Sequence, residues 1–239
     1  MKATISSIGF LANWRTRLVH FFFLPMVNMF LMVSINQEFF HSLFWNTAVA
    51  SILMSGALLV VNSMAFSFTT DRNLGIDREM VAAGRFSFYY WGWKIAVSVV
   101  CALLLILINL SLLLFFGGRE LPFILAISLI PQMIFSGAAV GFMAAILSWG
   151  DSDPYRISNF ITSFGYVLSG TMVAISAYPP GLRILGWFFP FAHTLGKLHG
   201  SDTSIWYDAL LSLLWLILGL ALYKKRAAKV RAQAKFSTL

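Results

Sequence analysis

The sequence is poor in charge and in cysteine. Only 11% of its 239 residues are charged, whereas 59% are hydrophobic. A soluble domain carries roughly a quarter charged residues, so this deficit excludes an ordinary soluble protein and predicts an all-α integral membrane protein. The single cysteine, Cys101, lies inside an apolar run, which excludes a disulfide framework and a cysteine-rich metal cluster.

Motifs for catalysis and nucleotide binding are missing as well. The sequence contains no His-Glu-x-x-His, no Gly-x-Ser-x-Gly and no Walker-type phosphate loop. Asp208 is the one carboxylate within the hydrophobic runs. Because charges inside a membrane mark proton and ion pathways, their scarcity disfavours ion-coupled transport. We therefore expect a protein that is no enzyme, binds no cofactor itself and draws energy for any uphill work from a partner.

Six hydrophobic runs are long enough to cross a bilayer. A helix needs about 20 mainly apolar residues to span the hydrocarbon core, and the alternating pattern of membrane β-strands is absent. The expected spans, all within one transmembrane domain, are residues 18–35, 45–68, 95–116, 123–149, 157–178 and 205–223. The basic tail that follows, 224–239, is expected to leave the membrane as a helix that touches lipid headgroups.

The net charge of +8 has a membrane explanation too. Cytoplasmic loops are enriched in Lys and Arg, and a cytoplasmic N-terminus leaves only Arg119, Arg183 and Lys197 of the 17 basic residues outside. We therefore expect both termini in the cytoplasm and a location in a bacterial-type plasma membrane. Membrane lipid, and not nucleic acid, is the partner that this charge distribution indicates.

One polar stretch interrupts the hydrophobic pattern between the second and third spans. Residues 69–94 read TTDRNLGIDREMVAAGRFSFYYWGWK, with charges of both signs followed by an aromatic cluster. Docking to lipid alone would favour Lys and Arg, so the mixed signs favour a short surface helix that docks against another protein. The alternative is a solvated connector without a partner.

The segment between the last two spans is apolar but broken by prolines. Residues 178–200 read YPPGLRILGWFFPFAHTLGKLHG, and each apolar piece is too short to cross, since proline interrupts helical hydrogen bonding. Irregular backbone survives at membrane depth only where it packs on protein or lines a cavity. We expect one or two short re-entrant helices in the outer leaflet, the alternative being a loop that lies on the headgroups.

Neutral polar side chains also fall inside the expected spans. Asn28, Asn62 and Asn109 are of the type that hydrogen-bonds between membrane helices, and Gly137 and Gly141 have the spacing that lets two helices approach closely. Packing is the usual role of such groups. The alternative for Asn28 and Asn62 is that they line a substrate path.

The polar stretch resembles the cytoplasmic loop of ABC-2 type permeases. The residues that carry the resemblance are Asp71, Arg72, Gly75, Met80, Gly84, Gly92 and Lys94. Residues 13–25, NWRTRLVHFFFLP, are similar to the N-terminal interfacial helix and first span of that family, and residues 168–195 are similar to its fifth span and re-entrant helices. Asn73, Ile76 and Gly84 depart from the pattern, since an acidic residue, Thr and Pro are usual there.

The resemblance implies a transport subunit that works with two cytoplasmic ABC ATPases, which bind ATP and Mg²⁺, and with a second copy or a related permease. Residues 69–94 then contain a coupling helix that contacts the ATPase. The contacts are expected from Asp71, Arg72, Gly75, Asp77, Arg78, Glu79, Gly84 and Arg85. By the same resemblance, the substrate path runs past Asn28, Asn62 and Phe164, and the outer gate of the re-entrant segment includes Pro180, Trp187 and Pro190.

The substrate is the least determined property. Members of the family export drugs, antimicrobial peptides and lipid-linked polysaccharides, among other cargoes. An amphipathic drug or peptide is the expected cargo, since 23 phenylalanines suit an apolar load; a polysaccharide or glycolipid is the alternative. A further alternative, from another class, is a non-transporting membrane scaffold or channel-like protein, in which the polar loop tolerates mutation.

Overall fold

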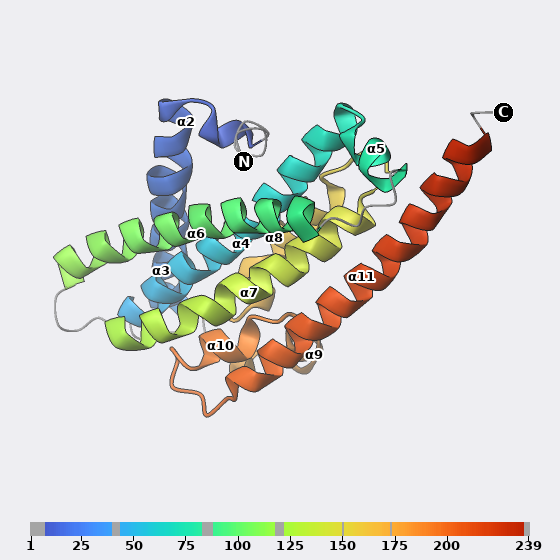
Figure 1. Cartoon of the computed structure of the whole chain (residues 1–239). Helices are drawn as coiled ribbons and strands as arrows, with labels where there is room; N and C mark the ends of the chain where they lie inside the picture. The colour runs from blue at the N-terminus through green and yellow to red at the C-terminus, as the bar shows by residue number, and fades with distance from the viewer. Residues whose placement is uncertain are drawn as a thin grey trace.

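The computed structural model describes residues 8–39, 44–82, 88–117, 122–149, 151–172 and 174–236, which form helices and turns without a β-strand (Figure 1). Within these ranges, five helices are long and apolar enough to cross a membrane. They span Trp14–Glu38, Trp45–Asn73, Tyr90–Phe116, Phe123–Leu147 and Ile205–Ala232. The expected all-α class is confirmed, and the five helices support a multi-pass membrane protein.

The elements follow one another in a simple order along the chain. They are η1 (Gly9–Leu11), α2 (Trp14–Leu18), the π-helical turn η2 (Val19–Phe23), α3 (Leu24–Phe39), α4 (Phe44–Asn73), α5 (Ile76–Ala82), α6 (Phe88–Gly117), α7 (Phe123–Leu147), α8 (Arg156–Leu168), η4 (Ile175–Ala177), α9 (Pro180–Trp187), α10 (Ala192–Gly196) and α11 (Ile205–Phe236). α5 and the C-terminal end of α11 lie at one end of the bundle, and α9 and α10 at the other (Figure 1).

α4 is the central helix and packs against α3, α6, α7 and α8. Hydroxyl side chains such as Ser51, Ser63 and Ser67 are fully buried along it. Lipid tails are as apolar as leucine, so large apolar side chains do not show which helix is buried in a membrane protein. Small residues are enriched where helices contact one another, because they let the backbones approach closely. The hydroxyls of Ser63 and Ser67 donate to the carbonyls of Leu59 and Met64 in the same helix, which satisfies them without a partner helix.

The close contact between α4 and α7 depends on two glycines. A Cβ on Gly137 would lie 2.7 Å from the carbonyl oxygen of Ala57, and one on Gly141 would lie 2.9 Å from the Cα of Val61. The small-xxx-small spacing in the sequence is therefore the surface on which α7 meets α4 within this chain. The outer helices are different, because they expose large side chains such as Phe115 of α6.

The run 157–178, expected to be the fifth span, is not one helix. α8 stops at Leu168, and its 13 residues cover only about 20 Å of the roughly 30 Å hydrocarbon core. Gly170 follows with a φ of +73°, the left-handed conformation that ends helices and favours glycine. Beyond it, the Met172 carbonyl accepts a hydrogen bond from the side chain of Asn36 in α3, so non-helical backbone here is satisfied by a neighbouring helix.

Both ends of the described chain are built into longer helices. In the described residues, the N-terminal interfacial helix is no separate element, because η1 is a single turn and α2 continues through η2 into α3. At the other end, α11 runs without a break to Phe236, so the basic tail prolongs the last hydrophobic helix. In residues 178–200, where one or two short helices were expected, the structure has α9 and α10, and the single turn η4 precedes them.

The α4–α7 contact predicts a sharp difference between two glycine substitutions. Gly137→Ala places a methyl group against the backbone of Ala57, which cannot rotate away, and we expect a loss of about 1–3 kcal/mol in unfolding free energy. Gly92→Ala is the control, since Gly92 is exposed in α6 with nothing within 4 Å of an added Cβ, and it is expected to gain up to about 1 kcal/mol. Unfolding of the detergent-solubilised chain measures both, and equal stability of the two variants would contradict the packing.

Candidate functional site

The polar stretch between α4 and α6 begins with a sharp turn. Gly75 has a φ of +75°, and its N–H donates to the carbonyl of Arg72 at 3.1 Å, an arrangement that ends helices and favours glycine. The chain then reverses into α5, whose seven residues lie across the end of the bundle (Figure 1). This turn places Asp71 and Arg72 on the last turn of α4, beside the start of α6.

A buried ion pair joins these two helices. Lys94 of α6, 2% exposed, lies 2.8 Å from Oδ2 of Asp71, and its Nζ also donates to the Ser67 carbonyl at 2.9 Å. The Tyr90 hydroxyl donates to the same carboxylate oxygen at 2.5 Å, and the ammonium lies 4.8 Å from the centre of the Tyr90 ring. Removing one partner from a buried pair costs about 3–5 kcal/mol, so this contact fixes the end of α4 against α6.

α5 is held against the end of α7 by a second buried carboxylate. Asp77 is 3% exposed and accepts a hydrogen bond of 3.0 Å from the indole Nε1 of Trp149. Arg72 donates to the carbonyl of Asp151 at 2.7 Å, and Arg226 of α11 donates to the carbonyl of Leu147 at 3.1 Å. Carbonyls in the last turn of a helix lack intrahelical partners and attract cations, so Arg226 caps α7, whereas Arg72 holds the loop that follows α7. We call Asp71, Arg72, Asp77, Tyr90, Lys94 and Trp149 the helix-end cluster.

The helix-end cluster gives three of the expected ATPase-contact residues a role within the chain. Asp71, Arg72 and Asp77 are all engaged in contacts with other parts of the chain, and their contact with an ATPase stays a prediction. Their mixed signs serve to fasten α5 to the bundle. Gly75 makes the turn itself, and Glu79 is the expected contact residue that is exposed and lies on α5.

Other expected contact residues are not settled by the structure, and one unexpected residue joins them. Arg78 lies in α5, but its side chain is not among those described, and Gly84 and Arg85 lie outside the described residues. Leu74, which was not singled out in the sequence, is 69% exposed at the turn beside α5.

A second feature starts from the π-helical turn η2. Pro25, at the start of α3, has no N–H to give to the carbonyl of Phe21 one turn earlier. The side-chain amide of Asn109 in α6 donates to that carbonyl at 2.8 Å, so a neighbouring helix satisfies the group that proline frees. The widened turn also positions His20, whose ring stacks on Phe10 with centroids 5.0 Å apart.

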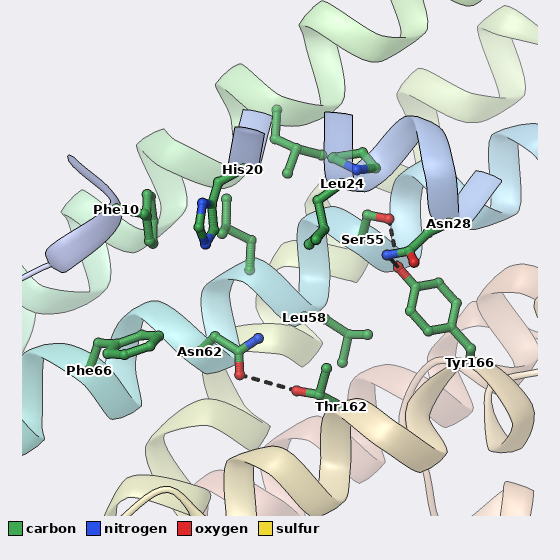
Figure 2. Close-up of a pocket in the computed structure, with 13 residues that line it drawn as sticks. Phe10, His20, Leu24, Asn28, Ser55, Leu58, Asn62, Phe66, Thr162 and Tyr166 are labelled. Carbon is green, nitrogen blue, oxygen red and sulfur yellow. Dashed lines mark hydrogen bonds between the residues drawn. The ribbon is translucent and has the colours of Figure 1, made fainter. Parts of the chain in front are cut away.

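Next to this turn lies a pocket between η1, α3, α4, α6 and α8, which we call the lateral pocket (Figure 2). Its lining residues are Phe10, His20, Leu24, Pro25, Asn28, Ser55, Leu58, Leu59, Asn62, Phe66, Leu105, Thr162 and Tyr166. None of these is Asp, Glu, Lys or Arg. The volume is about 130 Å³, close to that of a cavity that holds one benzene molecule.

The polar side chains of the lateral pocket form two hydrogen-bonded groups across helices, one of three residues and one of two. The Tyr166 hydroxyl of α8 lies 3.2 Å from Nδ2 of Asn28 and 2.7 Å from Oγ of Ser55. Thr162, one turn earlier on α8, donates to Oδ1 of Asn62 at 3.1 Å. Figure 2 shows the two groups facing the pocket from α3, α4 and α8. The pocket therefore offers neutral hydrogen-bonding groups beside apolar and aromatic walls.

The structure brings together two of the three residues expected on a substrate path. Asn28 and Asn62 line the lateral pocket, whereas Phe164 stands 47% exposed on α8 and packs against Phe160, with centroids 4.7 Å apart. Ser55, Thr162 and Tyr166 were missed by the sequence analysis. The available signal was spacing, since Ser55 and Asn62 are seven residues apart and Thr162 and Tyr166 four apart, which places each pair on one helix face.

The residues expected at an outer gate lie in the segment between α8 and α11. Pro180 begins α9, where its missing N–H costs nothing, and Trp187 ends α9 with 51% of its surface exposed. Pro190 is buried between α9 and α10. Asp208 of α11 is fully buried and accepts a hydrogen bond from the backbone N–H of Thr194, which ties α10 to α11.

Comparison with known proteins gives no relative from which a function for these features could be inferred. The chain has no significant match to a protein-family model, to a curated protein or to a solved structure.

The Asn109–Phe21 contact predicts a coupled pair of substitutions. Asn109→Leu leaves the Phe21 carbonyl without a donor, and we expect a loss of about 1–2 kcal/mol in unfolding free energy. In a Pro25→Ala background, the new backbone N–H can bond the same carbonyl, so Asn109→Leu is expected to cost less there. A double-mutant cycle in detergent measures the difference, and an equal cost in both backgrounds would contradict this account of the π turn.

Proposed function

We propose that this chain is the membrane-spanning permease subunit of an ATP-driven exporter of the ABC-2 type, powered by separate cytoplasmic ATPase subunits. The observation that carries the proposal is the attachment of α5 to the bundle by buried polar contacts. This short helix is fastened to α7 through Asp77 and Trp149, and the turn before it is fastened to α6 through Asp71 and Lys94. Glu79 on α5 and Leu74 in the turn before it are both exposed and remain available to a partner.

These contacts would allow α5 to transmit movement from a partner to the membrane helices. A partner that pushes on α5 displaces the ends of α4, α6 and α7 together, because buried polar contacts that cost several kcal/mol to break join them. α4 in turn contacts α3 and α8, the helices that complete the lateral pocket. Movement at α5 is thus passed to the pocket through one central helix, as coupling between ATP hydrolysis and transport requires.

The proposed topology has six crossings, with both termini on the side of α5. Arg226 caps the C-terminal end of α7 and Asp208 contacts α10. Since these two residues are 18 positions apart on one helix, they lie about 27 Å apart. The chain between α7 and α11 must cover that distance, and α8 with the segment up to η4 does so as a sixth, interrupted crossing in a bacterial-type plasma membrane.

The lateral pocket is proposed as part of the substrate path. Its lining has amide and hydroxyl groups, no acidic or basic side chain except the histidine, and aromatic walls, so it suits one uncharged ring or alkyl segment of an amphipathic drug or peptide. Two large side chains that line it, Leu24 of α3 and Phe66 of α4, are themselves exposed. We propose that a second permease copy, or a related permease, covers this face and completes the path, with α9 and α10 as its outer gate.

The partner half of the proposal is tested by purifying the tagged chain from its own host under gentle detergent. We expect a stoichiometric ABC ATPase, and a loss of about tenfold or more in captured ATPase for the double variant Leu74→Asp/Glu79→Lys, as for a hot spot of 1.4 kcal/mol or more. Asp202→Lys is the matched charge-reversal control, because Asp202 is exposed at the opposite end. Absence of an ATPase from the wild-type preparation would favour the scaffold or channel-like alternative.

The substrate half is tested by resistance of host cells to amphipathic drugs and antimicrobial peptides. Asn62→Asp introduces a charge without a partner into the lateral pocket, and we expect it to lower resistance by about tenfold, in line with the 1–3 kcal/mol cost of an unsatisfied polar group. Phe164→Leu, which alters the same region outside the pocket, is expected to leave resistance unchanged. Full resistance in cells whose Asn62→Asp chain is inserted normally would contradict the proposed substrate path. Loss of export of sugar-bearing cargo alone would favour the glycolipid alternative.

A further inference from the structure

A second cavity lies at the end of the bundle away from α5, enclosed by η4, α9, α10 and the start of the loop to α11. Its volume is about 220 Å³, enough for several water-sized groups. The polar and aromatic residues that line it are Ser176, Arg183, Trp187, His193, Ser201 and Thr203. Neither the helix-end cluster nor the lateral pocket contributes to this cavity.

Arg183 is the charged centre of the cavity. One of its terminal nitrogens, Nη2, donates to the carbonyls of Ser176 and Tyr178 at 2.6 and 3.2 Å, which fixes the guanidinium in place. Its Nε is buried and has no hydrogen-bond partner among the described residues. Arginine stays protonated in proteins, and no carboxylate of the described chain lies within ion-pair distance of it. Arg183 therefore lines this space as a fixed cation beside hydroxyl-bearing side chains, without a carboxylate partner among the described residues.

The nearby carboxylate does not neutralise Arg183. Asp208 lies next to the cavity through His193, but its two oxygens are already engaged. Oδ1 lies 2.9 Å from Nδ1 of His193 and Oδ2 accepts from the backbone N–H of Thr194 at 2.6 Å. The groups of the cavity that could bind a ligand are therefore Arg183 and the hydroxyl groups of Ser176 and Ser201.

We propose that this cavity binds a phosphate group. The forked donors of arginine match phosphate oxygens better than any other anion-binding side chain, and serine hydroxyls supply the additional donors. The surroundings favour the phosphate of a membrane lipid, because α9 carries an exposed apolar face beside the cavity. That face consists of Leu182, Ile184, Leu185, Trp187 and Phe188, each at least 41% exposed. A lipid headgroup in the cavity would lay its acyl chains along this face, and the Trp187 indole would stand at headgroup level.

The test uses the full chain in dodecyl maltoside micelles, which contain no phosphate. Phosphatidylglycerol is titrated in and the unfolding midpoint is followed, since a ligand that binds only the folded chain raises the midpoint as its concentration rises. We expect Trp187→Glu to bind the lipid at least about tenfold more weakly than Trp187→Gln, because the Glu carboxylate repels the lipid phosphate. Trp187→Gln also removes the indole but adds no charge, so it is the reference for this comparison. Trp187 is half exposed, so both variants are expected to fold.

A second arm, inorganic phosphate against chloride at equal ionic strength, separates the two sources of the group. Stabilisation by the lipid alone identifies a headgroup site, and stabilisation by both ligands identifies a site for phosphate itself; each supports the proposal. The proposal is overturned if neither ligand raises the midpoint, or if phosphatidylglycerol stabilises Trp187→Glu as well as Trp187→Gln. The second result would place lipid binding elsewhere, such as on the basic end of α11.

Discussion

The ion pair between Asp71 and Lys94 is the contact on which the proposed mechanism depends. A charged amine buried at the end of an apolar bundle is tolerated only when it is neutralised and hydrogen-bonded. Lys94 meets that condition with a carboxylate, a backbone carbonyl and the face of Tyr90. The pair closes the ends of α4 and α6 on each other and so sets where the turn at Gly75 leaves the bundle. The position of α5, and what it can transmit, follow from that closure.

Much of the fold was predictable from the sequence, because hydrophobic length is a strong signal in membrane proteins. Five of the six expected runs correspond to the five long helices. The run 157–178 is not one continuous helix, and the sequence did not show this because hydropathy does not register backbone conformation. Gly170 follows the end of α8, and the Met172 carbonyl accepts a hydrogen bond from the side-chain amide of Asn36, more than 130 residues earlier in the chain. Only three-dimensional contact shows that such a break is satisfied.

The sites were predictable only in outline. Charge density located α5 and its loop, but it did not show whether a given charge faces outward or inward. Asp77 and Glu79 are two residues apart in one short helix, and the first is buried against Trp149 while the second is exposed. Likewise, Asn28 and Asn62 stood out as amides within hydrophobic runs, whereas the hydroxyl of Tyr166 resembles that of any interfacial tyrosine. Its role follows from the pairing of α8 with α3 and α4.

The central claim is that the Asp71–Lys94 pair holds α5 in place, and hydrogen–deuterium exchange tests it most directly. The full chain is compared with Lys94→Met in the same detergent, with α10 as the internal reference at the far end of the bundle. The account predicts that the backbone amides of residues 76–82 exchange at least about tenfold faster in the variant, which corresponds to a loss of 1.4 kcal/mol or more in local stability, while α10 is unchanged. Equal exchange of residues 76–82 in the two proteins would show that α5 does not depend on this ion pair, and would contradict the proposed coupling.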